Sequence, residues 1–339
     1  MEQSALAAST PTTASRSHYD VLVIGGGTAG LSAALVLSRA RRSVLVVDAG
    51  APRNAPADHV HNYLGREGMA PADLAAQGRA EVRGYGGEVV SGNVVAATPA
   101  PAGGFEVDLA DGQRLRARRL LVATGLIDEL PEVPGLAEQW GRGIVHCPYC
   151  HGWEIRDQAV AVLGSGPFAV HQALMFRQWS ADVTLVRHTA PTPDADQREQ
   201  LAARGIVLIE EEVAAVETSD DRITGLRLRS GALVAAQAVT VTPRFVARTE
   251  ALTGLGLEAS DQQFGGTSIG SFIAADPTGA TSVPGVWVAG NVAELSATVI
   301  NSAAAGMTTA AAINADLTAE DNRAALDRHR SGAEAVART

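Results

Sequence analysis

The chain has few cysteines, no basic stripe and no apolar run long enough to cross a membrane. Only two cysteines, Cys147 and Cys150, occur among its 339 residues. The net charge is −10, which argues against a surface that binds nucleic acid. The most apolar long stretch, residues 292–315, is interrupted by polar side chains. We therefore expect a protein that binds neither nucleic acid nor a membrane.

Residues 1–18 are rich in Ser, Thr and Ala but lack the basic and apolar parts of a secretion signal. We expect a disordered tail there and a cytoplasmic protein. In that compartment a lone cysteine pair is more often catalytic than structural. The chain length suits two domains, and the 35 glycines indicate many tight turns.

The two cysteines form the motif Cys-x-x-Cys, flanked by His146 and His151. Two cysteines at this spacing can close a disulfide, and the motif commonly lowers a thiol pKa so that one sulfur becomes a ready nucleophile. The pair therefore predicts a redox centre that carries two electrons.

Three other interpretations of the pair stay open. A zinc site needs four ligands, and the chain has no second cysteine pair to supply them. Cys147, Cys150 and His151 also match the attachment motif of c-type haem, although haem attachment implies export. A buried, inert pair is the third interpretation, for which Pro, Tyr and two His are poor neighbours. We predict no metal site.

A strand–glycine turn–helix pattern opens the chain. The apolar run 20–24 leads into Gly25-Gly26-Gly27-Thr28-Ala29-Gly30, and residues 31–40 are typical of a helix. A second apolar run, 43–47, ends at Asp48. Such glycines let the backbone approach a pyrophosphate, and the acid accepts hydrogen bonds from ribose hydroxyls. Asp48 could instead be a solvated loop acid.

The pattern returns in the middle of the chain. A strand at 159–163 leads into Gly164-Ser165-Gly166-Pro167-Phe168-Ala169, a helix at 170–179 and a strand at 182–186. Two nucleotide folds in one chain indicate a flavin in the first and a nicotinamide-type fold in the second. Strands near 120–125 and 283–291 and a helix at 299–315 then return to the first fold.

We therefore predict an α/β fold with two Rossmann-like nucleotide-binding domains, the second inserted into the first. The expected boundaries are a disordered tail at 1–18, an FAD-binding domain at 19–130 and 250–320, an NADPH-binding-like domain at 131–249, and a C-terminal tail at 321–339.

The order of these motifs resembles the low-molecular-weight thioredoxin reductase family of FAD-dependent oxidoreductases. The resemblance also rests on Asn62-Tyr63, on Ala123-Thr124-Gly125 and on Gly290-Asn291. It implies bound FAD, a homodimer, Cys150 against the flavin and Cys147 as the outer thiol that meets the substrate.

We take Cys147, Cys150, His151 and His146 as candidate catalytic residues. The candidate FAD-binding residues are Gly25, Gly27, Thr28, Ala29, Gly30, Asp48, Arg53, Asn54, Asn62, Thr124, Gly125, Gly290 and Asn291. Arg53 and Asn54, like His59 and His61, follow Asp48 in a loop that either faces the flavin or has no binding role.

The chain departs from the family pattern at three places. A run of His and Arg that holds the 2′-phosphate of NADPH is reduced to Arg187 and His188, unless another loop supplies the charge. His151 stands where the reductases usually carry Asp, and imidazole is the better acceptor of a thiol proton at neutral pH. His146 could serve equally, and either could be a surface His. Asn291 replaces an Asp.

These departures resemble the dithiol oxidase branch of the family, which forms the intramolecular disulfides of natural products such as holomycin and gliotoxin. We therefore expect oxidation of a small dithiol, with O₂ reoxidising the flavin to give H₂O₂. The alternatives are an NADPH-dependent thioredoxin reductase and a non-catalytic redox sensor.

Overall fold

The computed structural model describes residues 13–337, and its largest sheet has seven strands in the order β3-β2-β1-β6-β5-β4, with β19 beside β6. Strands β1, β2, β3, β6 and β19 are parallel, whereas β4 and β5 are antiparallel. The strands are β1 (His18–Ile24), β2 (Val44–Asp48), β3 (Glu88–Ser91), β4 (Val94–Pro99), β5 (Phe105–Leu109), β6 (Arg114–Val122) and β19 (Val286–Val288).

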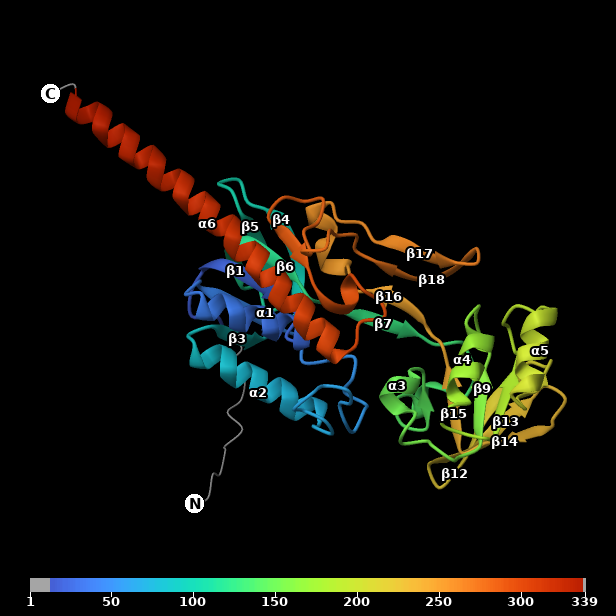
Figure 1. Cartoon of the computed structure of the whole chain (residues 1–339). Coiled ribbons are helices and arrows are strands. Elements are labelled where there is room, and N and C mark those ends of the chain that lie inside the picture. The colour runs from blue at the N-terminus through green and yellow to red at the C-terminus, as the bar shows by residue number, and fades with distance from the viewer. Residues whose placement is uncertain (1–12, 338–339) are drawn as a thin grey trace, which may run out of the picture.

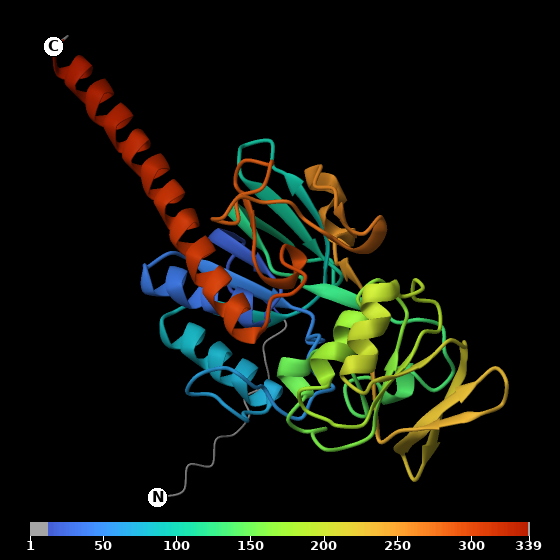
Figure 2. The ribbon, with the colours of Figure 1, turned by 45° about the vertical axis from the view of Figure 1, so that its right-hand side comes forward.

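Both faces of this sheet are buried, which explains the unbroken apolar runs of its central strands. Val21 and Val23 of β1 face the helices, and Leu22 and Ile24 face the opposite core. The helices on that first face are α1 (Thr28–Arg39), α2 (Pro71–Gly84) and α6 (Val299–Ala337), and α1 and α6 lie side by side in Figures 1 and 2.

A second parallel sheet has the order β11-β10-β9-β15-β8. A separate antiparallel sheet, β12-β13-β14, packs against it through a shared apolar core. Their elements are β8 (Ile144–Val145), α3 (Pro148–His151), β9 (Val160–Leu163), α4 (Ala169–Phe176), β10 (Val183–Val186), α5 (Ala195–Ala203), β11 (Val207–Ile209), β12 (Val213–Ser219), β13 (Arg222–Leu228), β14 (Leu233–Ala235) and β15 (Ala238–Val241).

The chain passes between the two parallel sheets through a four-stranded sheet, β17-β18-β16-β7. The outgoing strand β7 (Leu126–Glu129) pairs antiparallel with the returning strand β16 (Arg244–Ala247). The hairpin of β17 (Ser260–Phe264) and β18 (Thr267–Phe272) extends this sheet. Short 3₁₀ helices occupy Ala137–Gln139, Glu250–Leu255 and Gly290–Val292.

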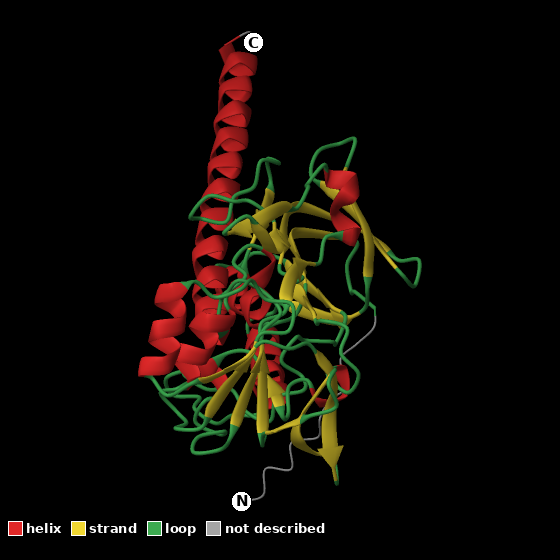
Figure 3. Cartoon of the chain, turned by 90° about the vertical axis from the view of Figure 1, so that its right-hand side faces the viewer, coloured by secondary structure: helices red, strands yellow, loops and turns green. Residues whose placement is uncertain are grey.

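The ends of the chain differ from the sequence-based expectation. Residues 1–12 lie outside the described part, but the amide and hydroxyl of Ser15 donate to Glu88, and His18 already belongs to β1. Instead of ending near 315, α6 continues to Ala337 and projects from the body (Figures 1 and 3). Ion pairs such as Arg118–Asp321 hold its middle turns.

No helix within residues 13–337 has the length and apolarity that a membrane crossing requires. The assignment of residues 19–130 and 250–320 to one domain, and of 131–249 to the other, stays a prediction.

Candidate functional site

One cavity of about 820 Å³ collects nearly all of the residues singled out from the sequence. The candidates that line it are Gly25, Gly27, Thr28, Ala29, Asp48, Arg53, Asn54, Asn62, Thr124, Gly125, His146, Cys147, Cys150, His151, Gly290 and Asn291. Gly30 does not line the cavity. A Cβ on Gly30 would lie 2.0 Å from the carbonyl oxygen of Gly25, so this glycine permits close packing beneath the turn.

The first glycine turn opens onto the cavity without a side chain in the way. Gly25 has φ +109°, and a Cβ there would lie 2.3 Å from the carbonyl oxygen of Ala123. Gly27 is the N-cap of α1 and has no side chain to accept from the free N–H groups of the first turn. Those N–H groups, with the positive end of the helix dipole, suit the pyrophosphate of a dinucleotide.

Asp48 ends β2 directly against this turn, because a Cβ on Gly26 would lie 2.5 Å from the Asp48 Cγ. A carboxylate in that place can accept hydrogen bonds from ribose hydroxyls. This turn therefore fits FAD. The N–H groups of α1 are uncapped, the glycine backbone allows close approach of a ligand, and Asp48 stands at the end of β2.

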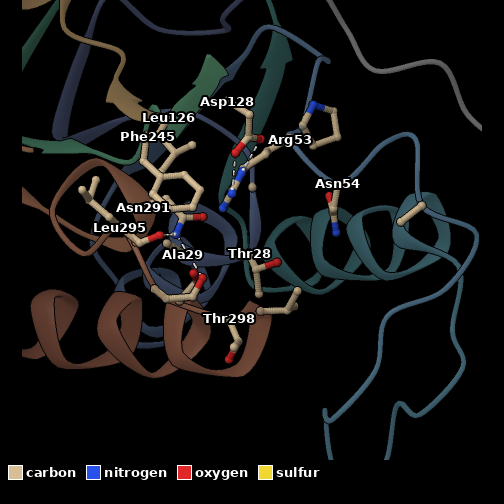
Figure 4. A pocket seen from close by; sticks show the side chains of 18 of the residues that line it. Thr28, Ala29, Arg53, Asn54, Leu126, Asp128, Phe245, Asn291, Leu295 and Thr298 are labelled. Carbon is tan, nitrogen blue, oxygen red and sulfur yellow. Dashed lines mark hydrogen bonds and ion pairs between the residues drawn. The ribbon is translucent and has the colours of Figure 1, made fainter. Parts of the chain in front are cut away.

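An ion pair between Arg53 and Asp128 forms part of the cavity wall. Arg53 donates through Nε and Nη2 to the two carboxylate oxygens of Asp128 at 2.8 and 2.7 Å. Its guanidinium lies 5.2 Å from the ring centre of Phe245, so β7 and β16 both hold it in place. Figure 4 shows this pair above Thr28 at the start of α1.

Two candidate cofactor residues also have structural roles. The Thr124 hydroxyl donates to the carbonyl oxygen of Arg248 at 2.8 Å and so ties the end of β6 to the returning chain. The Asn291 amide nitrogen reaches the carbonyl oxygens of Glu294 and Ala297, which shapes the loop before α6 (Figure 4). Because only its nitrogen is used there, the Asn291 oxygen remains free to accept from a ligand.

The cysteine pair lies at the start of α3. Cys150 donates its S–H to the Cys147 sulfur at 2.7 Å. This bond, with the backbone N–H groups of Cys150 and Tyr149, lowers the pKa of Cys147 to about 7 despite burial. The same bond raises the pKa of Cys150, as does burial. Arg53 favours the thiolate at both positions. Cys147 is therefore the more acidic sulfur.

The two flanking histidines have different surroundings. Burial lowers the pKa of His146 to about 4, and the charge of Arg53 acts in the same direction. Its ring stacks on Trp140, with ring centres 5.8 Å apart. Burial also lowers the pKa of His151, but the carboxylate of Glu154 opposes that shift. His146 is thus a very weak base, and His151 is the better placed of the two to take a proton.

Several cavity residues were not singled out from the sequence. Asp128, Phe245 and Gln172 line the cavity from three separate elements. The Gln172 side chain, only 5% exposed, donates to the carbonyl oxygen of His146 at 3.0 Å and so anchors the segment that enters the cysteine motif. Nothing in the local sequence marks these residues, because each reaches the site through the fold of the whole chain.

The second glycine turn is built differently from the first. Phe168, the N-cap of α4, packs on Phe264 of the β17–β18 hairpin with ring centres 4.5 Å apart. After β10, Arg187 donates to the carbonyl oxygen of Ala190 at 3.1 Å. His188 accepts from the backbone N–H of Val213 at 3.0 Å. Both basic side chains therefore bond to protein backbone.

Within the described part of the chain, no group of three or more His, Cys, Asp or Glu is placed to hold a metal ion. The cysteine pair and its two histidines thus do not form such a group.

Comparisons with known proteins support this description. The family model for pyridine nucleotide-disulphide oxidoreductases matches residues 19–310. Thioredoxin reductase aclD of Aspergillus oryzae is 33% identical over 293 residues, covering 80% of this chain and 88% of that protein. Thioredoxin reductase tcpT of Claviceps purpurea is 40% identical over 174 residues, 49% of this chain and only about half, 54%, of that protein.

The solved structure of HlmI is 46% identical, with a TM-score of 0.85, and the match covers 94% of this chain and 98% of that one. The predicted α/β fold with two Rossmann-like units is confirmed by this match and by the family model.

Proposed function

We propose, from the premise that this chain belongs to the pyridine nucleotide-disulphide oxidoreductase family, that it oxidises a small dithiol to an intramolecular disulfide with O₂ as the final acceptor. The protein is an oxidoreductase that binds FAD, as its family does. The observation that carries the proposal is the position of Cys147, Cys150 and His151 in one cavity with the first glycine turn.

The exchange begins at the oxidised cysteine pair. A substrate thiol gives its proton to His151, and its thiolate attacks the Cys147 sulfur. The bond between Cys147 and Cys150 breaks, and Cys150 leaves as the thiolate. The second substrate thiol then loses its proton and attacks the substrate's own sulfur in the mixed disulfide. The cyclic disulfide forms, the bond to Cys147 breaks, and Cys147 leaves as the thiolate, which can take up a proton.

The reaction balances as dithiol plus O₂ giving cyclic disulfide plus H₂O₂. FAD bound at the first glycine turn would supply the two-electron acceptor that the reduced cysteine pair needs, with O₂ as the final acceptor. The chain's own contribution is positioning and proton removal: Arg53 favours the thiolates, and Gln172 anchors the segment at His146.

The second candidate is an NADPH-dependent thioredoxin reductase, which the names of the relatives favour. That activity needs a cationic site for the 2′-phosphate of NADPH beside the second glycine turn. Residues 187–193 contain only Arg187 and His188 as basic side chains, each with one hydrogen bond to backbone, and Phe168 packs on Phe264. This sparse set of cations favours the oxidase.

Oxygen consumption tests the choice. We expect purified protein to consume O₂ and release H₂O₂ with a panel of small dithiols and no nicotinamide. Under nitrogen, the same dithiols bleach the flavin absorbance, whereas micromolar NADPH leaves it unchanged. Rapid bleaching by NADPH, with no turnover of small dithiols in air, would establish the reductase instead.

We also propose a homodimer, on the family resemblance and on two large apolar side chains, Ile300 and Met307, exposed on α6. Light scattering on the purified protein gives the mass directly. A monomer at micromolar concentration contradicts the proposal. The cytoplasmic location stays a prediction.

A further inference from the structure

A second cavity, of about 500 Å³, adjoins the redox site on the surface of the molecule. Its lining residues are His61, Asn62, Glu67, Tyr149, Trp153 and Glu154. Three of them, His61, Asn62 and Tyr149, also line the large cavity, so the two spaces meet beside the cysteine motif. The volume lies in the range of small-molecule sites.

Two aromatic side chains in this cavity stand open to solvent. Tyr149, between the two cysteines, is 64% exposed, and Trp153 is 66% exposed. Each ring is in contact with one neighbouring side chain. Tyr149 packs edge-on against Trp179 and accepts at its carbonyl oxygen from Asn62 at 2.6 Å. Arg156 lies over the Trp153 ring, 4.2 Å from its centre. Held but exposed aromatic rings offer apolar contact at little cost in side-chain entropy.

The charged side chains that line the cavity are two carboxylates and one imidazole between them. The Nδ1 atom of His61 lies 2.6 Å from Glu67, and its Nε2 atom lies 3.4 Å from Glu154. The hydrogen bonds that Glu67 accepts from His61 and from the Asn62 N–H hold its pKa below its usual range. One imidazole balances at most one of the two carboxylates. Arg156 lies behind the Trp153 ring and does not line the cavity.

We propose that this cavity, the aromatic–acidic pocket, is the subsite that receives the part of the dithiol substrate remote from its sulfurs, and that it selects uncharged or cationic substrates over carboxylates. The inference rests on the proposed function. Continuity with the redox cavity places a substrate here within reach of the cysteine motif. An anionic group would meet two carboxylates, whereas an amide or ammonium group would meet hydrogen-bond acceptors.

Dihydrolipoamide and dihydrolipoate test this selectivity, because they carry the same dithiol and differ only in an amide against a carboxylate. We expect kcat/KM to favour the amide at least about fivefold, the effect of one pair of like charges about 4 Å apart in water. The preference should shrink as salt screens the charges. Equal kcat/KM values at low salt would overturn the proposal.

A pair of matched variants tests whether Glu67 causes the preference for the amide. Glu67→Gln should reduce the amide preference, whereas Glu258→Gln, the same charge change at an exposed residue that lines neither cavity, should preserve it. Glu154 is unsuitable for this test because its charge also acts on His151. An equal reduction in both variants would show that net charge, and not this pocket, sets the selectivity, and an unchanged preference in Glu67→Gln would overturn the role of Glu67.

A binding measurement separates this proposal from the proposed function. In the Cys147→Ser/Cys150→Ser variant, we expect lipoamide to change the tryptophan fluorescence at lower concentration than lipoate does. Adding Trp153→Ala should weaken lipoamide binding. If lipoamide binds more tightly than lipoate but no dithiol causes the parent protein to consume O₂, the proposed function is wrong and the binding preference of the pocket is still supported. If dithiols are oxidised but lipoamide and lipoate bind alike, the pocket proposal fails alone.

Discussion

The two glycine turns share a strand–turn–helix pattern but offer different surfaces to a ligand. In the first, Gly27 leaves the N–H groups of α1 uncapped and open to a cavity that Asp48 also lines. In the second, Phe168 packs on Phe264, and Arg187 bonds to the backbone of its own loop. A glycine fingerprint therefore establishes that a backbone can approach a dinucleotide. The residues around it decide whether one is bound.

In the proposed function, electrons enter through the sulfurs and not through the second turn. In the variant Cys150→Ser we expect dithiol-driven O₂ consumption to fall at least about 10³-fold, because Cys147 then has no partner with which to form the enzyme disulfide. Cys147→Ser should fall equally, and the double variant no further, since the two residues act as a unit.

An anaerobic titration of these variants sharpens the comparison. Bound flavin, measured by its absorbance, should remain at the parent level, which excludes loss of the cofactor as the cause. If the second turn did receive NADPH, the flavin of Cys150→Ser would still be bleached by it, and our view of that turn would be wrong.

Substitution of the proposed base, His151, should have the next largest effect on the rate. We expect His151→Gln to lower kcat/KM for a small dithiol by about 10²–10⁴-fold, the usual contribution of a general base. As the proposed base, His151 would act in its neutral form, and burial lowers its pKa. The parent rate should therefore rise with pH, with the midpoint of the rise below the ordinary value of about 6.5. In the variant, the rise should follow the substrate thiol's own ionisation at higher pH.

His146→Gln is the matched control for this pH profile. Because the pKa of His146 is lowered to about 4, it is neutral throughout the range where the protein is assayed. Its variant should keep the rise that belongs to His151. Loss of that rise in His146→Gln, with its retention in His151→Gln, would exchange the two assignments.

The features that were predictable from sequence depend on local chain geometry. Buried parallel strands require continuous apolar runs, and a tight turn beneath a dinucleotide requires glycine, so both folds were recognisable. The contacts of Arg53 with Asp128 and of Gln172 with His146 join segments more than 20 residues apart. Sequence also left His146 and His151 equivalent, because the difference between them is burial and the charge of Arg53.

The outer half of α6 is helical, although a C-terminal tail was expected from the sequence at residues 321–339. Residues 318–331 are mostly polar or Ala and none of them is buried. Ala, Glu and Arg nevertheless have high helix propensity, and Arg42 and Arg118 pair with Asp321 at the start of this part. A helix that is polar all round is not visible to an argument from hydrophobic periodicity.

The smallest expected effect is the most direct test of the two turns. Gly27 and Gly166 occupy the same place in the two motifs, and a Cβ at either has no protein atom within 4 Å. Alanine should therefore leave the unfolding temperature of each apoprotein nearly unchanged.

At Gly27 the new methyl group occupies the space through which a pyrophosphate approaches the N–H groups of α1. Overpacking of this kind typically costs about 1–3 kcal/mol, so FAD should bind to Gly27→Ala at least about fivefold more weakly. Gly166→Ala should bind FAD as the parent does and keep its dithiol oxidation rate. Bleaching of the parent flavin by NADPH under nitrogen, with slower bleaching in Gly166→Ala, would show that both turns hold dinucleotides and that their difference is only one of affinity.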